Sequence, residues 1–392
     1  MDDRSTPARL IRTEAEALAV AAEFRASLAE GAAERDRHRR LPLAEVAALS
    51  QSGLWAITVP REHGGADVGY AALAEVVARL AEGDSSVAQI PQNHFSTLET
   101  LRHIAPAPVQ REFFARVLAG ARFGNAEAER GPPAMLRPAE TGFRLDGRKA
   151  YCTGALFAHF VTVTARDAEG RAVVAIVERD APGLTLLDDW SGMGQRTTAS
   201  GTAILDALAV PAARVLPLWQ ASARRTTIGA LAQLLHAAID LGIARAALAE
   251  TARFVHERSR PFADAGVPRA ADDPLLVVRF GQVQTRVHAA EAMLARAAAS
   301  LDAARNAADE TACSAASIAV AEAKVLTTEA ALAAADALFE LAGTHATLAC
   351  YNLDRYWRDA RTHTLHDPIR WKHHAIGDWH LNGAAPPIRS YL

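Results

Sequence analysis

The spacing of apolar residues changes twice along the chain and divides it into three parts. Over residues 14–120, apolar side chains recur every three or four positions, for example in 43–49 and 73–80. This is the period of amphipathic helices. Turn and helix-start residues interrupt it near 60–65, 83–86 and 106–108. The pattern therefore predicts a small helical domain over residues 1–120.

Residues 121–218 instead contain short runs rich in β-branched residues, at 160–164, 172–177 and 184–187. Asp146-Gly147, Glu169-Gly170 and Pro182-Gly183 lie between such runs and predict turns. This spacing is typical of antiparallel β structure. We therefore expect a β-domain between two helical parts.

Residues 219–392 are rich in alanine and helical in pattern, with long stretches near 222–258, 274–304 and 310–342. Helices of about thirty residues suit an antiparallel four-helix bundle. Small side chains also let helices approach closely, so the bundle is a candidate oligomer interface. The whole pattern predicts an α+β protein with a helical domain, a central antiparallel β-domain and a C-terminal helical bundle.

Composition excludes several classes of protein. The 392 residues include 42 Lys and Arg against 45 Asp and Glu, without long runs of one sign, which argues against nucleic-acid binding and a basic membrane patch. Cys152, Cys313 and Cys350 show no C-x-x-C spacing, so no disulfide framework or zinc knuckle is expected. No apolar run reaches about 20 residues and the first residues lack a signal-peptide pattern, so we expect a soluble, cytoplasmic protein.

Sequence motifs for common cofactors and nucleophiles are absent. The chain has no G-x-x-x-x-G-K-[ST] phosphate loop, no G-x-G-x-x-G dinucleotide fingerprint and no G-x-S-x-G nucleophile elbow. Nicotinamide chemistry on a Rossmann domain and serine hydrolysis are therefore disfavoured.

Histidine is the side chain best suited to proton transfer near neutral pH. The chain has fourteen, and the last thirty residues hold His363, His366, His373, His374 and His380. His363 and His366 straddle a turn before a proline, and neither H-E-x-x-H nor paired Glu-x-x-His helices occur, so no metal ion is expected. Most of these imidazoles are expected to be structural, and one or two to be functional.

Two polar positions near the β-domain are candidates for a binding site. His94 follows Pro91 in a polar stretch that predicts the start of a helix turned inward, a usual wall of a site; the alternative is a capping cluster that uses Asn93 and Ser96. Asn125 opens the β-domain, where it could equally be an ordinary turn residue.

Further candidates lie at the end of a strand and at the end of a helix. Thr153 could donate a hydrogen bond to a flavin ring, and Gly154 beside it permits close approach of a ligand. Arg258 and Arg260 end the first long helix. Cations are favoured there by the helix dipole, and the functional alternative is a bidentate grip on a phosphate.

Several strings together resemble the acyl-CoA dehydrogenase superfamily over nearly the whole chain. They are GLWAITVPREHGG at 53–65, DGRKAYCTG at 146–154, GMGQRTTASG at 192–201 and RDAR at 358–361. The resemblance implies a homotetramer, a dimer of dimers. It also implies a flavin between the β-domain and the C-terminal bundle, in a site that the neighbouring subunit completes.

Departures from the dehydrogenase pattern change the implied chemistry. Dehydrogenases of the superfamily commonly carry a catalytic Glu in Tyr-Glu-Gly-Thr, where this chain reads LHDP at 365–368, with the shorter Asp367. The Arg-x-Gln-Phe-Gly string that meets the flavin adenylate is altered to RSRPF at 258–262. These departures, with WKHHAIGDWHLNG at 371–383, are similar to the flavin-dependent monooxygenase branch, which includes sulfur-acquisition oxidoreductases and dibenzothiophene monooxygenase.

Such a resemblance implies a two-component monooxygenase. It would take reduced FMN from a separate NAD(P)H:flavin reductase, add O2 to form a C4a-hydroperoxyflavin, and oxygenate a small organosulfur compound in sulfur acquisition. His94 and His374, or its neighbour His373, would act as hydrogen-bond donor and proton shuttle, with Asn125 and Thr153 orienting the oxygen. Two sets of residues would contact the cofactor: Tyr151 and Gly154 at the flavin ring, and Arg258 or Arg260 with Phe262 at the phosphate.

Two other activities stay open on the same scaffold. One is an acyl-CoA dehydrogenase that keeps FAD and uses Asp367 as its base. The other is an N-hydroxylating flavoenzyme or a non-catalytic relative. Loops 129–141 and 262–274 are rich in proline and glycine and are expected to act as lids over a pocket.

Overall fold

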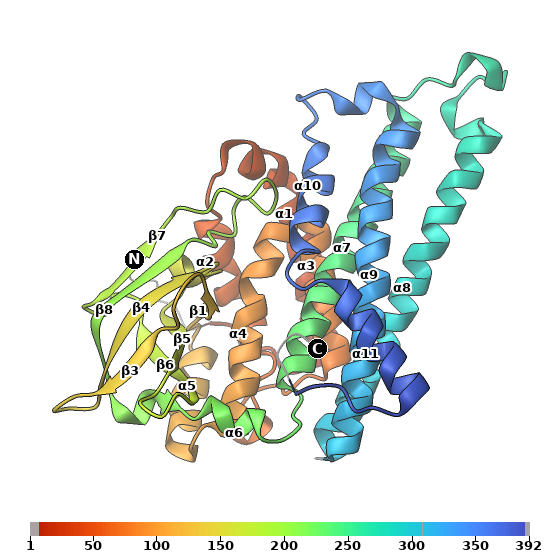
Figure 1. Ribbon diagram of the computed structural model, residues 1–392. Coiled ribbons are helices and arrows are strands. Elements are labelled where there is room, and N and C mark those ends of the chain that lie inside the picture. The colour runs from red at the N-terminus through yellow and green to blue at the C-terminus, as the bar shows by residue number, and fades with distance from the viewer. Residues whose placement is uncertain (1–7, 308, 389–392) are drawn as a thin grey trace.

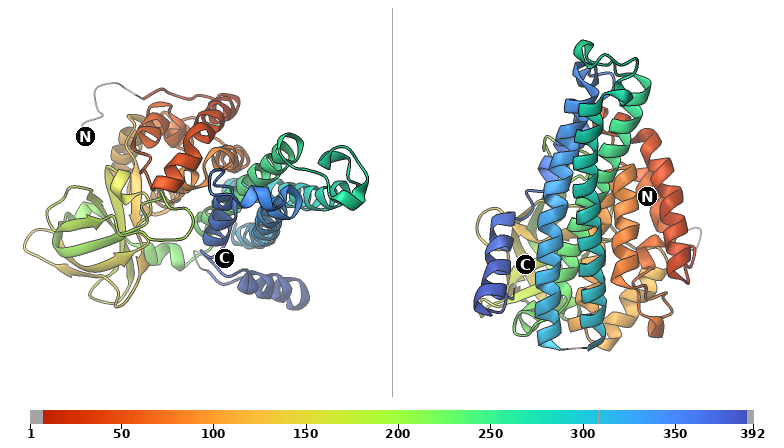
Figure 2. Two further views of the ribbon diagram at one scale, coloured as in Figure 1. Left: turned by 90° about the horizontal axis from the view of Figure 1, so that it is seen from above. Right: turned by 90° about the vertical axis from the view of Figure 1, so that its right-hand side faces the viewer.

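The computed structural model describes residues 8–307 and 309–388, and it places the helical, β and helical parts in the predicted order (Figures 1 and 2). The first part consists of α1 (Glu14–His38), α2 (Leu43–Gln51), α3 (Tyr70–Gly83), α4 (Ser85–Ile104) and α5 (Ala107–Leu118), with two short 3-10 turns, η1 (Leu54–Ala56) and η2 (Arg61–His63). The predicted helical domain is confirmed.

Helix α4 begins nine residues before the position predicted from the polar stretch around His94. Asp84 is its N-cap, because the carboxylate accepts hydrogen bonds from the backbone N–H groups of Ser86 and Val87. Pro91 then lies inside the helix. The expectation of a helix start near residue 94 was wrong because the proline was taken as a boundary, whereas strong capping upstream and packing on both sides hold the helix through it.

The middle part is one sheet of nine strands in the order β7-β8-β4-β3-β5-β6-β9, with β1 beside β5 and β2 beside β4. The strands are β1 (Phe123–Ala126), β2 (Ala128–Glu129), β3 (Met135–Pro138), β4 (Phe143–Ala150), β5 (Phe160–Arg166), β6 (Ala172–Glu178), β7 (Leu184–Leu187), β8 (Thr202–Val210) and β9 (Val215–Leu216). The three β-rich runs are strands, as predicted. The sheet is mixed rather than purely antiparallel, since β5 pairs in parallel with β1 and β3.

One predicted turn is a bulge instead. Asp146 and Gly147 lie inside β4, where the register against β8 shifts between Leu145 and Gly147. Gly147 has φ +148, a conformation that side chains rarely adopt, and Asp146 accepts a hydrogen bond from the backbone N–H of Ala207. An Asp-Gly pair serves a bulge as readily as a turn, so the dipeptide alone did not distinguish them.

The last part contains α6 (Leu218–Ser222), α7 (Ile228–Glu257), α8 (Pro274–Ala307), α9 (Glu310–Ala342), α10 (Asp354–His363) and α11 (Ile369–Asn382). The three long helices match the three predicted stretches, and the short α10 and α11 complete the bundle (Figure 1). Within the described residues α7 is the one helix long and apolar enough to cross a membrane, and most of its apolar stretch is buried inside the protein.

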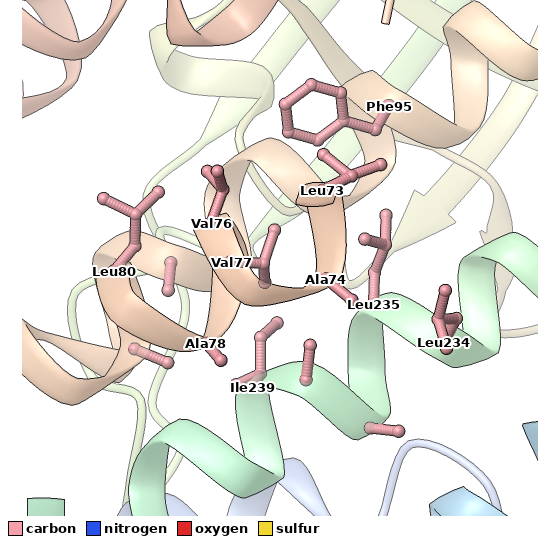
Figure 3. Close-up of a cluster of buried hydrophobic side chains, with 14 of the residues drawn as sticks. Leu73, Ala74, Val76, Val77, Ala78, Leu80, Phe95, Leu234, Leu235 and Ile239 are labelled. Carbon is pink, nitrogen blue, oxygen red and sulfur yellow. The ribbon is translucent and has the colours of Figure 1, made fainter. Parts of the chain in front are cut away.

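Helix α7 joins the bundle to the first domain. Leu73, Ala74 and Val77 of α3 pack against Leu235 and Ile239 of α7 (Figure 3). Burying side chains of this size stabilises the fold by about 1.5–3 kcal/mol each. This interface fixes α4, which follows α3 directly, against both the sheet and the bundle.

Candidate active site

The first half of α4 forms a wall between the sheet and the bundle. On the sheet side, a Cβ added to Gly154 would lie 3.3 Å from the side chain and the carbonyl oxygen of Ile90. On the bundle side, Gln92 donates a hydrogen bond to the carbonyl of Ala232 in α7, and Gln89 faces the end of α10. Residues 89–92 of α4 therefore lie against groups on both sides of this wall.

On the sheet side, the structure brings Asn125, Thr153 and Gly154 together. The backbone N–H of Asn125 donates to the carbonyl of Thr153 at 3.3 Å. Its side-chain Oδ1 is buried and has no hydrogen-bond partner among the described residues. A buried acceptor without a donor costs about 1–3 kcal/mol, so this amide is arranged for a donor on a bound ligand.

Hydroxyl groups continue this polar surface. The Thr153 and Ser200 hydroxyls lie 2.6 Å apart, those of Ser200 and Thr198 lie 2.8 Å apart, and Thr198 donates to the carbonyl of Gln195. If each hydroxyl donates toward Gln195, the lone pairs of Thr153 are left to accept. In this arrangement the Thr153 hydroxyl accepts a hydrogen bond from a ligand.

Glycines make the same surface flat and closely packed. A Cβ on Gly124 would lie 2.5 Å from the Cα of Ala155, and Gly154 has φ +75. Tyr151 is 55% exposed, has φ +54, and its ring lies 6.2 Å from that of Trp190. We call Asn125, Tyr151, Thr153 and Gly154 the ledge. A closely packed ledge that is exposed at Tyr151 and has one unpaired acceptor at Asn125 fits the edge and face of a planar ring such as a flavin.

His94 is fully buried beside the ledge and has both ring nitrogens in use. Nε2 lies 2.7 Å from the Trp55 carbonyl, to which it donates, and Nδ1 accepts from the backbone N–H of Phe123. Burial lowers the pKa of His94 to about 3, so the ring is neutral and suited to these two bonds. His94 thereby fixes the start of β1, two residues before Asn125.

The other predicted histidines lie apart from the ledge. His373 and His374 are exposed on α11, which packs on α9, and the His374 ring lies 5.6 Å from that of Trp371. Figures 1 and 2 show α11 on the bundle side of α4. Within one chain the structure does not bring either residue together with Asn125 and Thr153.

The predicted phosphate residues also lie apart. Arg258 follows the end of α7, its guanidinium 5.1 Å from the centre of the Tyr351 ring. Arg260 and the 71% exposed Phe262 follow it. Figures 1 and 2 place this end of the bundle on the side away from the sheet, so these residues do not meet the ledge within one chain.

On the bundle side, the structure reveals a group that sequence reasoning missed. His236 of α7, His363 at the end of α10 and His366 in the following turn offer ring nitrogens that all lie within 4.8 Å of one another. We call these three residues the histidine cluster. His236 and Asp240, one helix turn apart, and the H-x-x-H at 363–366 were the available signals, but nothing in the sequence links segments more than 120 residues apart.

A buried ion pair lies behind the histidine cluster. Asp240 accepts hydrogen bonds from Lys324 and Thr328 of α9 and, at 2.5 Å, from His363 Nδ1. Burial alone would raise the pKa of Asp240, but Lys324 and His363 hold it below its usual range. Burial lowers the pKa of His363 to about 4, with Asp240 opposing that shift. At neutral pH the pair is therefore ionised and His363 is neutral.

The turn after α10 contains Asp367, the residue that the dehydrogenase resemblance implies as the catalytic base. Asp367 accepts a hydrogen bond from Gln233 of α7 at 2.8 Å, and Gln233 accepts one from Lys372 at 2.8 Å. Burial lowers the pKa of Lys372 to about 8. The Asp367 carboxylate is thus engaged in a network, while His366 in the same turn is exposed.

A helical domain, a mixed sheet and a helical bundle around a glycine-built ledge define the acyl-CoA dehydrogenase fold. The acyl-CoA dehydrogenase N-terminal domain family matches residues 12–121, and the C-terminal domain family matches residues 234–371. The chain belongs to the acyl-CoA dehydrogenase family, in its flavin-dependent monooxygenase branch, as the following relatives show.

A probable FMNH2-dependent monooxygenase of Pseudomonas putida, SfnC, is 31% identical over 96% of this chain and 97% of its own length. FMN-bound TdsC from Paenibacillus sp. A11-2, a dibenzothiophene monooxygenase, has a TM-score of 0.92 at 29% identity and covers 96% of this chain and 100% of that one. Methanesulfinate monooxygenase MsuC from Pseudomonas fluorescens has a TM-score of 0.90 at 29% identity, over 96% and 99% of the two chains. The protein is thus similar to flavin monooxygenases over nearly its full length.

Proposed function

We propose that this protein is a cytoplasmic two-component monooxygenase that uses reduced FMN and O2 to oxygenate a small organosulfur compound in sulfur acquisition. The observation that carries the proposal is the unpaired buried Asn125 Oδ1 on the ledge. It stands in a chain that resembles FMN-dependent monooxygenases over almost all its residues. A separate NAD(P)H-dependent reductase would supply the reduced flavin.

The ledge residues are suited to hold a flavin ring. Asn125 Oδ1 would accept from a ring N–H, the Thr153 hydroxyl would meet a second polar atom at the ring edge, and Gly154 would let the ring approach the backbone. Reduced FMN, when bound, would supply the two electrons for a reaction in which one atom of O2 goes to sulfur and the other leaves as water.

The chain's own residues orient the reactants and handle protons. His94 sets the position of β1 and hence of Asn125, because its two nitrogens join η1 to Phe123. We keep His374 as the predicted proton shuttle, with His373 as its alternative. Since α11 is separate from the ledge within one chain, either residue would act on the ledge of a neighbouring subunit.

We further propose that a homotetramer completes each site. Arg258 or Arg260 would grip the phosphate of an FMN bound on the ledge of a second subunit, and Phe262 would contact the same cofactor. This accounts for the position of these residues at the end of the bundle away from the sheet.

The first experiment is stopped-flow spectroscopy of the purified protein mixed with reduced FMN and then with oxygenated buffer. We expect the bound flavin to show a long-lived absorbance, from oxygen attached at C4a, before the absorbance of oxidised flavin appears. Turnover with a reductase, 18O2 and dibenzothiophene, methanesulfinate or dimethyl sulfone would then yield a product with one 18O. Reoxidation at the rate of free flavin, with no labelled product, would contradict the proposal.

The same preparations separate the alternative activities. An acyl-CoA dehydrogenase would retain FAD and reduce a dye with acyl-CoA, using Asp367 as its base. The hydrogen bond from Gln233 to that carboxylate and the shorter side chain argue against this role. Oxygenation of an amine in place of sulfur compounds would indicate an N-hydroxylating enzyme.

A further inference from the structure

Hydrogen bonds join the histidine cluster to the buried ion pair in one continuous chain. Lys324 donates to Asp240, Asp240 accepts from His363 Nδ1 at 2.5 Å, and His363 Nε2 lies 3.2 Å from His236 Nδ1. Asp240, Lys324 and His363 have no exposed surface, and His236 has 7%. This series of hydrogen bonds therefore runs from the core of the bundle to His236, which is slightly exposed.

Burying these charged and polar side chains costs free energy, and apolar residues would pack equally well in their place. The other buried residues of α7 and α9 are mostly alanine, leucine, isoleucine and valine. A buried ion pair rarely stabilises a fold relative to apolar side chains of similar volume. Clustered titratable groups with perturbed pKa values are instead typical of functional sites.

The ring nitrogens have assigned roles. A carboxylate at Asp240 requires a proton on His363 Nδ1, which leaves Nε2 of the neutral ring as an acceptor for His236 Nδ1–H. His366 Nδ1 lies 2.7 Å from the carbonyl of His363 and so carries a proton, which leaves its Nε2 as an acceptor. As in a catalytic triad, a carboxylate orients an imidazole that is hydrogen-bonded to a third group.

One contact offers an acceptor for a second proton on His363. Its Nε2 also lies 3.0 Å from Gln89 Oε1, an acceptor that a neutral His363 cannot satisfy. When His363 is protonated on both nitrogens, Nε2–H can donate to Gln89 while Nδ1–H stays on Asp240. Burial lowers the pKa of His363 to about 4, so the doubly protonated ring is the minor form at neutral pH.

The histidine cluster adjoins the candidate active site through α4. Gln89 touches the cluster, and a Cβ added to Gly154 of the ledge would lie 3.3 Å from the next residue, Ile90. The cluster and the ledge are therefore both held at the first half of α4.

We propose that His236 is an acid–base residue of the active site and that His363 and Asp240 are positioning residues behind it. The inference rests on the proposed function. When His236 takes up a proton on Nε2, it passes the proton on Nδ1 to His363 Nε2, and the resulting imidazolium faces the Asp240 carboxylate. The reverse transfer restores the neutral rings, so no other reactant is needed.

The charges on the elements packed around the histidine cluster disfavour a metal ion there. Lys324 of α9 and Lys372 of α11 both lower the pKa of His236, after burial and the other two imidazoles. Asp240 is already neutralised by Lys324, Asp367 lies beside Lys372 and Gln233, and α4 offers the neutral Gln89. No carboxylate charge is left over for a divalent cation, although the three nitrogens are close enough to bind one.

The test begins without flavin. Solid-state 15N spectra of histidine-labelled protein distinguish Nδ1–H from Nε2–H rings, with each signal assigned by its loss in a His→Gln variant. We expect Nδ1–H at His363, and at His236 a change from Nδ1–H to Nε2–H in His363→Leu, which removes the acceptor. An Nε2–H ring at His363 in the wild type overturns the relay. One equivalent of bound zinc that is lost in His236→Gln overturns it as well.

Turnover tests the role in the reaction. We expect His363→Gln to lower kcat about 100-fold with an unchanged KM and to increase peroxide release, since general acid–base groups contribute about 10²–10⁴ in rate. The control, His380→Gln, changes an exposed histidine bonded to Glu322 and should stay within about twofold of wild type. A kcat for His363→Gln close to wild type overturns the proposal.

A milder variant keeps the test valid if His363→Gln does not fold. Thr328→Val preserves shape and removes one hydrogen bond to Asp240, and it should lower kcat severalfold with KM unchanged. An unchanged kcat in this variant counts against the relay. If the wild type itself forms no oxygenated product, the proposed function fails, whereas the ring-proton measurement still decides the relay.

Discussion

Individual side chains at the junction of the three parts carry charges or polar atoms that their surroundings do not fully satisfy. Asn125 Oδ1 has no donor among the described residues, and His236, His363 and Asp240 form a buried titratable chain. Each lies on or beside α4. At this scale the site is recognisable as one unpaired acceptor and one buried titratable chain inside a largely apolar fold.

Removing the Asn125 side chain should weaken flavin binding without harming the fold. We expect Asn125→Ala to raise the Kd for FMN about fivefold, since one hydrogen bond contributes about 1 kcal/mol. Thermal stability without flavin should not fall, because the change removes an unpaired acceptor. Quenching of FMN fluorescence measures the affinity. Asn382→Ala, at an exposed amide bonded to Asp378, is the control, and equal affinities in the two variants would show that Asn125 does not contact the flavin.

Asp359 should make the stability of the protein depend on pH. Burial raises its pKa to about 7, and Asp36 and Asp84 add to the shift, against the hydrogen bonds from Gln195 N–H and Ser85. The native protein therefore keeps a proton that the unfolded chain loses above about pH 4. Stability should fall by on the order of 4 kcal/mol between about pH 4 and 7 and then level off.

The variant Asp359→Asn tests this origin. The amide oxygen can accept from the Gln195 N–H, and its NH2 can donate to the Ser85 hydroxyl, so both contacts survive without the charge. Thermal unfolding at pH 5 and pH 8 should then differ less in the variant than in the wild type. An equal pH dependence of the two proteins would assign the effect to other groups.

At the scale of elements, α4 decides where the site lies. Its first half contacts the sheet through Ile90 and His94 and the bundle through Gln89 and Gln92. Pro91 stands between these residues and cannot donate a hydrogen bond to the carbonyl of Val87. The helix thus carries a weakness at the point where both halves of the site attach to it.

Replacing Pro91 should stabilise the protein and lower its activity. A proline inside a helix costs about 3 kcal/mol relative to alanine, so we expect Pro91→Ala to raise the Tm of the flavin-free protein. A straighter helix would displace Gln89 relative to His94 and lower turnover. Calorimetry and product formation measure the two effects. Pro106→Ala, at the N-cap of α5, should change neither. A lower Tm for Pro91→Ala would mean that the proline ring itself stabilises the packing.

Elements with strong periodic patterns were predictable, whereas contacts across the sequence were not. The three long helices and the three β-rich strands follow from local spacing, and the resemblance indicated the family. The start of α4 was missed because its cap lies ten residues before His94, at Asp84. The histidine cluster was missed because His236 and His363 meet only after α7 and α10 have packed together.

At the scale of the whole molecule, the candidate site is divided between two distant regions. The ledge lies on the sheet, and Arg258 and Arg260 lie at the end of the bundle away from it (Figures 1 and 2). Apolar side chains are exposed near that end, including Phe262 at 71% and Leu275 at 79%. Exposed apolar surface of this kind is typical of an interface, which is the arrangement that a shared site requires.

Mixed oligomers can show whether two subunits share one flavin site. Gly154→Val should abolish flavin binding through the ledge, because the position has φ +75 and a Cβ there would press on Ile90. The double variant Arg258→Ala and Arg260→Ala should abolish it through the phosphate. Each variant alone is expected to be inactive, and each should still form the oligomer.

Joint expression of these two variants with different affinity tags distinguishes a shared site from a site within one chain. If the arginines act on a neighbouring subunit, half of the sites in each mixed pair combine an intact ledge with intact arginines. Random mixing would then restore about a quarter of wild-type activity. If ledge and arginines had to belong to the same chain, every site would lack one of them. A preparation that contains verified mixed oligomers but shows no activity would therefore refute the shared site.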